Sequence, residues 1–267
     1  MQNNYFFGAF IQLSQKIAKF VLYNSVVKHI SFEFMAKKHV SELKPIDEVL
    51  SFWDVLTPDE RQFVRNNYTV HHFRKNEIIH YENDIPTHMM ILESGKVKVS
   101  KSGVGSRLQI IRMLKPGEHF SYRAIIANET YNTNVTAFES STVYMIKADI
   151  FLSILRHNNA FCYRFLEEVA SDLAASDART VNLTQKHIRG RLAEALLILK
   201  RNYGMEEDGA TISIYLSRED LANLSNMTTS NAIRTLSNFV NEHIIAMDGR
   251  KLKIIDEDRL WKISKMG

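Results

Sequence analysis

A short run of polar side chains near the C-terminal end of the sequence has residue types that bind to a DNA groove. Thr228, Thr229, Ser230 and Asn231 are followed one helical turn later by Arg234. Arginine can pair with guanine through two hydrogen bonds, asparagine can do so with adenine, and hydroxyl groups bond to phosphates or base edges. A helix face that only meets solvent usually carries more Glu and Lys, whereas this run has no acidic residue. We therefore predict that these side chains contact DNA.

Two helices are predicted to hold this run in place. Ser217 begins a capping-box pattern that ends at Asp220, so a first helix is predicted over 217–224 and a second over 228–240. Ser217 and Arg218, at the start of the first helix, are predicted to contact DNA as well. Five apolar residues are expected to form the small core between the helices: Leu221, Leu224, Ile233, Leu236 and Val240.

A β-hairpin is predicted after the second helix. Two apolar stretches, Ile244–Ala246 and Leu252–Ile255, flank Asp248-Gly249, a pair that suits a type I′ turn. Helix, turn, helix and hairpin in this order are typical of a winged helix-turn-helix.

Composition and charge limit the classes of protein that remain. With 267 residues, 45% hydrophobic and 24% charged, the chain is a globular protein of about two domains. A single cysteine, Cys162, excludes an internal disulfide, a cysteine-ligated zinc site and an iron–sulfur cluster. The net charge of +4 equals that of residues 1–44 alone, which hold six basic and two acidic residues. The DNA prediction therefore rests on motif and placement, not on bulk basicity.

The first 34 residues differ from the rest of the chain. Apolar residues recur at helical spacing opposite a basic face, which predicts an amphipathic helix. Such a helix can lie on a membrane surface or a partner, or pack on its own protein. The sequence Met35-Ala-Lys-Lys would also serve as a second translation start. No apolar run is long enough to span a membrane and no basic n-region begins the chain, so we expect a cytoplasmic protein.

The segment from about residue 68 to 148 has the pattern of a β-barrel or sandwich. It follows a helix predicted to begin at Thr57, which precedes Pro58 and Glu60 as in a capping box. Turn residues then separate short apolar and β-branched stretches, which is typical of many short strands. The predicted strands are Glu77–His80, Met89–Leu92, Lys96–Ser100, Gln109–Met113, Asn134–Ala137 and Thr142–Ile146.

A long helical pattern follows Lys147. Steps of four and three alternate along Cys162, Leu166, Val169, Leu173, Ser176, Thr180, Leu183 and His187. This spacing is a heptad seam. Pairing of two such helices about a two-fold axis explains it more simply than one helix that lies on its own domain. We predict a homodimer whose seam includes Leu166, Val169, Leu173 and Thr180. The polar residues of its lower half leave room for a small molecule.

The order of these elements resembles the cyclic-AMP receptor and fumarate-nitrate regulator (Crp-Fnr) family of bacterial transcription factors. The resemblance covers about Ile46 to Ile263. It rests on Arg74–Glu77 and Glu82–Pro86, which are similar to the family's Lys-Gly-Glu and Glu-Gly-Asp-x-Pro turns, with Asn76 and Asn83 where the family has glycine. Asparagine tolerates a left-handed backbone, so both turns are expected to persist. Further matching segments are Met90–Val97, Leu114–Phe120, Gly190–Ala193 and Ser217–Leu236.

The resemblance implies a sensor pocket, but its two charged residues are replaced. Family members that bind cyclic AMP hold the ribose with a glutamate and the phosphate with an arginine. Tyr122 stands in place of the glutamate and Tyr131 in place of the arginine, while Arg123 is near enough in sequence to supply a cation. A buried cyclic phosphate without that arginine would be poorly compensated, so we expect no binding of cyclic AMP in the usual pose. The predicted effector pocket consists of Phe120, Ser121, Tyr122, Arg123, Tyr131, Asn132, Thr133 and Ser176.

The recognition helix also departs from the family. Thr229-Ser230 replaces an Arg-Glu pair that the family often has, whereas Arg234 is kept. The resemblance therefore implies insertion into a DNA groove but not the family's usual operator.

The residues give little support for a metal site, a bound cofactor or an enzymatic activity. Some similar proteins bind haem through histidine, and five histidines lie in the β segment: His71, His72, His80, His88 and His119. They have no metal-ligand spacing, so we expect no metal site and leave any cofactor unknown. Nucleophile elbow, phosphate loop and His-Glu-x-x-His motifs are missing, and we predict that the protein is not an enzyme.

These inferences together predict an α+β protein with four parts. They are a helical extension (1–44), an effector-binding β-roll (45–156), a dimerisation helix (157–183) and a winged-helix DNA-binding domain (184–267). The expected partners are double-stranded DNA, a second copy of the chain, a small-molecule effector and RNA polymerase. The alternative is a ligand- or partner-binding module of the same fold without DNA binding. Affinity for duplex DNA that falls steeply with salt would distinguish the two.

Overall fold

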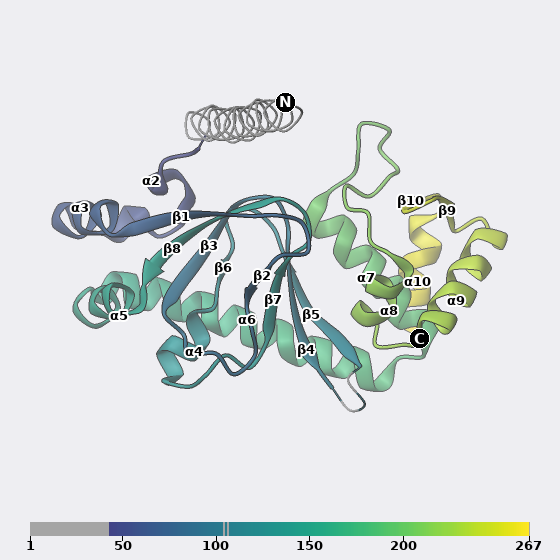
Figure 1. The fold of residues 1–267 in the computed structure, drawn as a ribbon. Helices are drawn as coiled ribbons and strands as arrows, with labels where there is room; N and C mark the ends of the chain where they lie inside the picture. Colours follow the sequence, from purple (N-terminus) through teal and green to yellow (C-terminus); the bar gives the residue numbers. More distant parts are fainter. Residues whose placement is uncertain (1–42, 104, 106, 267) are drawn as a thin grey trace, which may run out of the picture. The chain divides into compact units, whose positions relative to one another are not determined.

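The computed structural model describes residues 43–103, 105 and 107–266. The amphipathic helix predicted near the N-terminus lies outside these residues. Ile46–Gly267 forms one compact unit, distinct from Met1–Pro45. This unit contains a β-roll, a long helix and a C-terminal group of helices with a hairpin (Figure 1), as the α+β prediction requires.

Two four-stranded antiparallel sheets form the β-roll, with strand orders β1-β8-β3-β6 and β2-β7-β4-β5. The strands are β1 (Tyr68–Phe73), β2 (Ile78–His80), β3 (His88–Ser94), β4 (Val97–Ser102), β5 (Leu108–Leu114), β6 (His119–Phe120), β7 (Asn134–Ala137) and β8 (Ser141–Lys147). Six consecutive residues of β8 are buried, since this strand lies between β1 and β3 and is covered on both faces. All six predicted strands are confirmed. The sequence pattern missed β1, a half-exposed edge strand with two histidines, and the two-residue β6.

Short helices surround the roll. They are α2 (Ile46–Val49), the 3₁₀ helix η1 (Trp53–Val55), α3 (Pro58–Asn66), α4 (Tyr122–Ala127) and α5 (Ala148–His157). The predicted capping box of α3 is present, because Thr57 Oγ1 accepts from the amide of Glu60 and the Glu60 carboxylate accepts from the amide of Thr57. Helix α4 was not predicted, and it lies between strands β6 and β7 in the sequence.

Two asparagines take the left-handed backbone that glycine adopts most readily. Asn76 has φ 66° and Asn83 has φ 74°. The Asn76 amide donates to the Ala137 carbonyl, and the Asn83 amide donates to the Tyr131 carbonyl, each at 2.7 Å. The expectation that asparagine preserves both turns is confirmed.

Helix α6 (Asn159–Gln185) is the long helix that the heptad spacing predicts. Asn158 caps it, with Oδ1 accepting from the Phe161 amide at 2.9 Å. Phe161 and Phe165 are buried against Phe52 and Phe151, so one side of the first half of α6 packs on the β-roll. His187 is the one seam residue that the helix does not include, because the backbone of Lys186 is extended and α7 (Ile188–Tyr203) begins after it.

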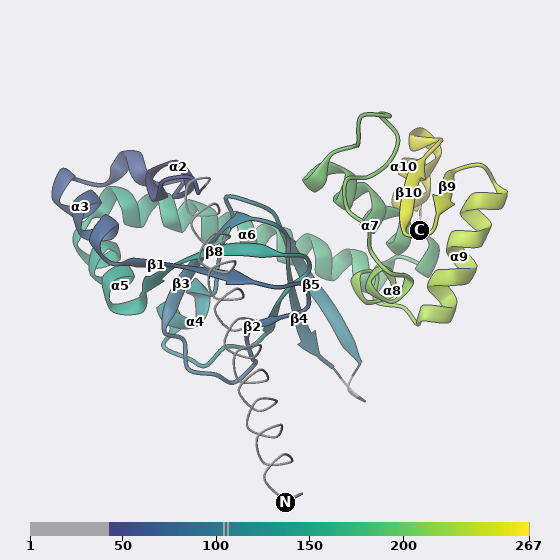
Figure 2. The same cartoon turned by 45° about the horizontal axis from the view of Figure 1, so that its top comes forward.

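The C-terminal part is a winged helix-turn-helix. It consists of α7, α8 (Arg218–Leu224), α9 (Thr229–Asn241), β9 (Ile245–Asp248), β10 (Lys251–Ile254) and α10 (Glu257–Met266). Figure 2 shows α9 along one edge of this group, with the hairpin beside it. Asp248 pairs with Lys251, so the hairpin loop is Gly249-Arg250 and not the predicted Asp248-Gly249. Positive φ occurs at Gly249 (56°) and not at Arg250, which is the pattern of a type II′ turn.

The hydrophobic core of the C-terminal part extends into the β-roll. Ile110 and Met113 of β5 belong to the same buried cluster as Leu221, Leu224 and Leu236. The two parts therefore share a core, which gives the β-roll a direct mechanical link to α8.

Candidate functional site

Two side-chain caps set the N-terminal ends of α8 and α9, the helix pair of the predicted DNA-binding site. Ser217 Oγ accepts from the Asp220 amide at 3.0 Å and donates to the Asp220 carboxylate at 2.7 Å, so the predicted capping box is present. Thr228 Oγ1 accepts from the Asn231 amide at 3.3 Å and caps α9. Between the helices, Asn226 has φ 51°, which turns the chain sharply. These local bonds fix where α9 begins.

The predicted contact residues lie on the outer face of α9. Thr228, Thr229, Ser230 and Arg234 are exposed and Asn231 is half-buried. The Arg234 guanidinium donates to Asn231 Oδ1 at 2.8 Å, so the two groups that can pair with bases are held next to each other. The structure thus brings the predicted α9 residues together on one accessible surface.

Two residues predicted for the core between the helices are instead exposed. Ile233 is 50% exposed and Val240 is 36% exposed. The inner face of α9 consists of Ala232, Thr235, Leu236 and Phe239, which follow the i, i+3, i+4, i+7 spacing of a buried helix face. Ile233 and Val240 come one position after Ala232 and Phe239, so a rotation of about 100° per residue carries them away from the core.

The two α8 residues of the predicted site have structural partners. The hydroxyl of Ser217 is engaged in the cap of α8. Arg218 donates to the Gly249 carbonyl and lies 3.8 Å from Met247 Sδ, so it ties α8 to the hairpin. Both therefore position the elements that present α9.

The first of the two replaced sensor residues, Tyr122, is buried and bonded to the long helix. Its side chain is 3% exposed, and its hydroxyl donates to Asp172 Oδ2 of α6 at 2.5 Å. Arg112 of β5 donates to the same carboxylate at 2.7 Å and to Glu118 at 3.1 Å. Burial, the hydrogen bond to Asp172 and the negative charges of Asp172 and Glu168 raise the pKa of Tyr122 against the opposing charge of Arg112, so it stays a neutral donor. The network connects β5, α4 and α6.

The second replaced residue, Tyr131, is also buried, at 4% exposed. Its ring stacks on His80 with 3.7 Å between ring centroids, and His80 Nε2 lies 2.8 Å from Ser121 Oγ. Burial lowers the pKa of His80 to about 4, so this imidazole is neutral near pH 7. The sequence predicted no metal site at His80, one of the five histidines of the β segment, and identified no partner for it. About 50 residues separate His80 from Tyr131, and the fold brings them together. No local sequence pattern reveals such a contact.

Ser121 is the predicted pocket residue that joins this group, because its hydroxyl lies 2.8 Å from His80 Nε2. Phe120 is buried and Ser121 half-buried, whereas Arg123 and Asn132 are exposed. Thr133 is half-buried, and Ser176 is exposed on α6. Arg123, which is near enough in sequence to supply a cation, is exposed at the start of α4.

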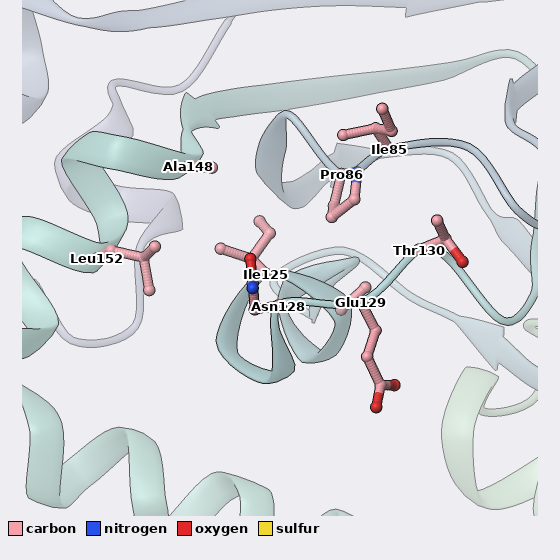
Figure 3. Close-up of a pocket in the computed structure, with 9 residues that line it drawn as sticks. Ile85, Pro86, Ile125, Asn128, Glu129, Thr130, Ala148 and Leu152 are labelled. Atoms are coloured by element: carbon pink, nitrogen blue, oxygen red, sulfur yellow. The ribbon is translucent and has the colours of Figure 1, made fainter.

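An open pocket of about 310 Å³ lies beside α4 (Figure 3). It is formed by Ile85 and Pro86, by Ile125 and Asn128 at α4, and by Leu152 of α5, together with Ala124, Glu129, Thr130 and Ala148. None of the predicted effector residues lines it. Its lining is mainly apolar and presents no cationic side chain.

The predicted dimer seam is partly accessible. Leu166 and Leu173 are 60% and 62% exposed, and Thr180 is exposed, on a helix that has apolar cover on its other side. Val169 is half-buried and packs against the core of the roll, so it is shared between the seam and the domain. Seam residues Leu166 and Leu173 are thus among the exposed apolar side chains of the described residues.

Two further features are absent from residues 43–103, 105 and 107–266: a metal-binding cluster and a membrane-spanning helix. No group of three or more His, Cys, Asp or Glu residues there could hold a metal ion. No described helix is both long and apolar enough to cross a membrane.

Models of two protein families match the chain. The cyclic nucleotide-binding domain matches residues 70–158, and the Crp-like helix-turn-helix domain matches residues 190–263. A CRP-like cAMP-activated global transcriptional regulator of Mycobacterium tuberculosis is 22% identical over 189 residues, 70% of this chain and 84% of the relative. A global nitrogen regulator of Nostoc is 22% identical over 185 residues, 68% of this chain and 83% of the relative.

Solved structures show the same fold. A transcriptional regulator of the crp/fnr family from Eubacterium rectale superposes with a TM-score of 0.69 at 19% identity, covering 82% of this chain and 99% of that one. FixK2 from Bradyrhizobium japonicum superposes with a TM-score of 0.67 at 20% identity, covering 73% and 96%. A sensor-like β-roll joined to a winged helix-turn-helix defines a DNA-binding transcription regulator. The chain belongs to the Crp-Fnr family.

Proposed function

We propose that the protein is a homodimeric regulator that binds a specific DNA sequence and does not bind cyclic AMP in the usual pose. In this proposal residues 45–156 form the sensor, 157–183 the dimerisation helix and 184–267 the DNA-binding domain. The observation that carries it is the pair of exposed surfaces, the outer face of α9 and the seam of α6. Each surface carries side chains suited to the partner that it would take.

The α9 face supports binding in the major groove. Its exposed residues are neutral or cationic, and Asn231 and Arg234 are held side by side at 2.8 Å. Two-fold symmetry of the dimer would place two copies of α9 about one turn of DNA apart, so the operator is expected to be an inverted repeat.

The α6 seam supports dimerisation. Leu166 and Leu173 are seven residues apart and exposed, so burying both against a second copy recovers hydrophobic stabilisation that the monomer lacks. Asp172 and Glu168 of the same helix bond to Tyr122 and His119 of the roll. A change in the sensor would therefore reach the dimer helix, and shift the spacing of the two recognition helices.

The two tyrosines, Tyr122 and Tyr131, disfavour the binding of cyclic AMP in the usual pose. They fill the places of the ribose-binding and phosphate-binding residues with buried, neutral rings. Arg112, a nearby half-buried cation, is already paired with Glu118 and Asp172, and these pairs raise its pKa against the opposing effect of burial. A cyclic phosphate there would have to displace a carboxylate. The Mycobacterium relative is named as cAMP-activated, so the two proteins would differ in effector.

Selection of duplexes from a random pool tests the DNA-binding proposal. Purified protein without added ligand is expected to enrich an inverted repeat. A repeat enriched only after cell extract is added would instead show a required effector. Enrichment of single half-sites, one per protomer, would contradict the dimer.

Calorimetric titration with cyclic AMP tests the sensor proposal. We expect no saturable heat at millimolar ligand. Two results together would contradict the proposal: saturable binding of cyclic AMP by the wild-type chain, and the same binding by Tyr131→Phe. The stacked ring at position 131 would then leave room for the nucleotide.

A further inference from the structure

Ile233 is an apolar side chain that stands among the polar groups of the α9 outer face. It is 50% exposed, whereas Ala232 and Leu236 beside it are buried. At 3.6 residues per turn, Ile233 lies between Thr229, four residues before it, and Ser230, three residues before it. All three are in the first part of the helix, the part that contacts base edges when a recognition helix enters the major groove.

Neither the core nor the helix requires an isoleucine in this place. The inner face is filled by Ala232, Thr235, Leu236 and Phe239, so Ile233 has no hole to fill. A β-branched side chain also lowers helix propensity relative to alanine. The hydroxyl of Ser237, one turn later, donates to the Ile233 carbonyl at 3.0 Å and so is used within the helix. Ile233 is therefore the outward group of this turn that can make an apolar contact.

The major groove offers one apolar group, the 5-methyl of thymine. We propose that Ile233 contacts the 5-methyl group of a thymine in each half-site and so determines specificity at that base pair. This inference rests on the proposed function, since it requires that α9 enters the groove. The Asn231–Arg234 pair would bond to neighbouring bases, and Ile233 would select thymine over cytosine, which lacks the methyl group.

The test replaces thymine by uracil in the selected operator, one symmetric pair of positions at a time. Uracil lacks the methyl group and keeps the hydrogen-bonding groups of thymine. At one position the wild-type protein is expected to lose affinity about fourfold per half-site, the effect of burying one methyl-sized group, and about sixteenfold for both. Ile233→Ala is expected to bind the thymine duplex about as weakly and to lose nothing more on uracil.

Val240→Ala is the matched control. Val240 is also an exposed β-branched residue of α9, 36% exposed, but lies seven residues nearer its C-terminal end. This variant is expected to keep the uracil effect of the wild type. Ile233→Val, which keeps a branched side chain, is expected to retain part of it. Equal salt dependence on random duplex DNA would show that all variants fold and bind non-specifically alike.

Three outcomes would overturn the inference: wild-type affinity that no uracil substitution changes, an equal uracil effect in Ile233→Ala, or a selected half-site that contains no thymine. An absence of any duplex binding would contradict the proposed function itself and is distinguishable from these.

Discussion

At the scale of single residues, the sensor differs from a cyclic-AMP site by two tyrosines, Tyr122 and Tyr131, in place of two charged residues. A glutamate or arginine at positions 122 and 131 would need a charged partner when buried, and a ligand can supply one. A buried tyrosine hydroxyl needs one hydrogen bond: Tyr122 donates to Asp172, and Tyr131 donates to the His88 carbonyl at 3.5 Å. The buried hydroxyls of these two tyrosines are therefore satisfied by the protein's own groups.

His80 makes stability depend on pH. Its pKa falls from an ordinary 6.5 to about 4 because the folded protein buries it. Between these values the unfolded chain binds the proton more strongly, so the stability present above pH 6.5 is lost as pH falls toward 4. The full effect is about 3 kcal/mol. Urea unfolding from pH 7 to 4 is expected to show this slope, and His80→Gln to reduce it.

His157→Gln is the control for that experiment, because it removes an exposed imidazole from the end of α5. A slope that His80→Gln leaves unchanged would mean that other groups cause the acid sensitivity.

Arg234 is expected to determine specificity at one base pair. Asn231 holds its guanidinium on the open face of α9, so little ordering remains to be done on binding. Arg234→Ala should cost about 1–3 kcal/mol at one operator position, if the contact is bidentate to guanine. Binding to a set of single-base operator variants measures this. An equal loss on every sequence would instead identify a phosphate contact.

At the scale of elements, the β4–β5 hairpin and α8 form a joint between sensor and DNA-binding domain. Lys98 Nζ of β4 lies 3.0 Å from Asp220 Oδ1, and both side chains are mostly buried. Arg179 of α6 donates to the carbonyls of Ile110 on β5 and Leu224 on α8, at 2.6 and 3.1 Å. One residue of the long helix thus bonds to both sides of the joint.

Loss of the Lys98 charge is expected to weaken this joint. Burial alone would raise the pKa of Asp220, but bonds from Ser217 and Lys98 outweigh it and lower the pKa. Lys98→Met keeps the apolar stem and leaves the carboxylate without its cation, at a cost of about 1–3 kcal/mol. Thermal unfolding should show a lower midpoint. Separation into two transitions would show that the sensor and the DNA-binding domain had become uncoupled.

Lys101→Met is the matched control, on the same strand. Lys101 pairs with Glu82 at 3.5 Å in a more exposed position, so its loss should change stability by about 0.5 kcal/mol or less. An equal effect of the two variants would contradict a special role for the joint.

At the scale of the whole molecule, dimerisation decides whether two α9 helices can bind one operator. Cys162 lies on the predicted seam and is exposed, so in a parallel pair the two copies would face each other. Mild oxidation is expected to give a covalent dimer on a non-reducing gel, and Cys162→Ser to remove it. Leu173→Glu should give a monomer by light scattering, with affinity for the inverted repeat reduced at least tenfold.

Tyr163→Glu is the control for Leu173→Glu, since Tyr163 is also exposed on α6 but one position off the seam. A dimer that persists in Leu173→Glu, or a wild-type monomer at micromolar concentration, would contradict the proposed seam.

The parts of the fold that depend on local chemistry were predictable. Capping boxes at Thr57 and Ser217, the two left-handed asparagines and the long helix each depend on residues a few positions apart. The strands β1 and β6 were not predictable, because an edge strand and a two-residue strand have almost no pattern of their own.

The sequence by itself determined the class of this protein, the order of its elements and the polar residues on the outer face of α9. Periodicity, caps and turn residues act over one or two helical turns, and the sequence contains them directly. Tertiary structure alone decided that Ile233 is exposed, that Tyr131 stacks on His80, and that β5 shares a core with α8. Those facts depend on which distant surfaces meet when apolar area is buried, and contacts between residues 50 or more positions apart leave no local pattern.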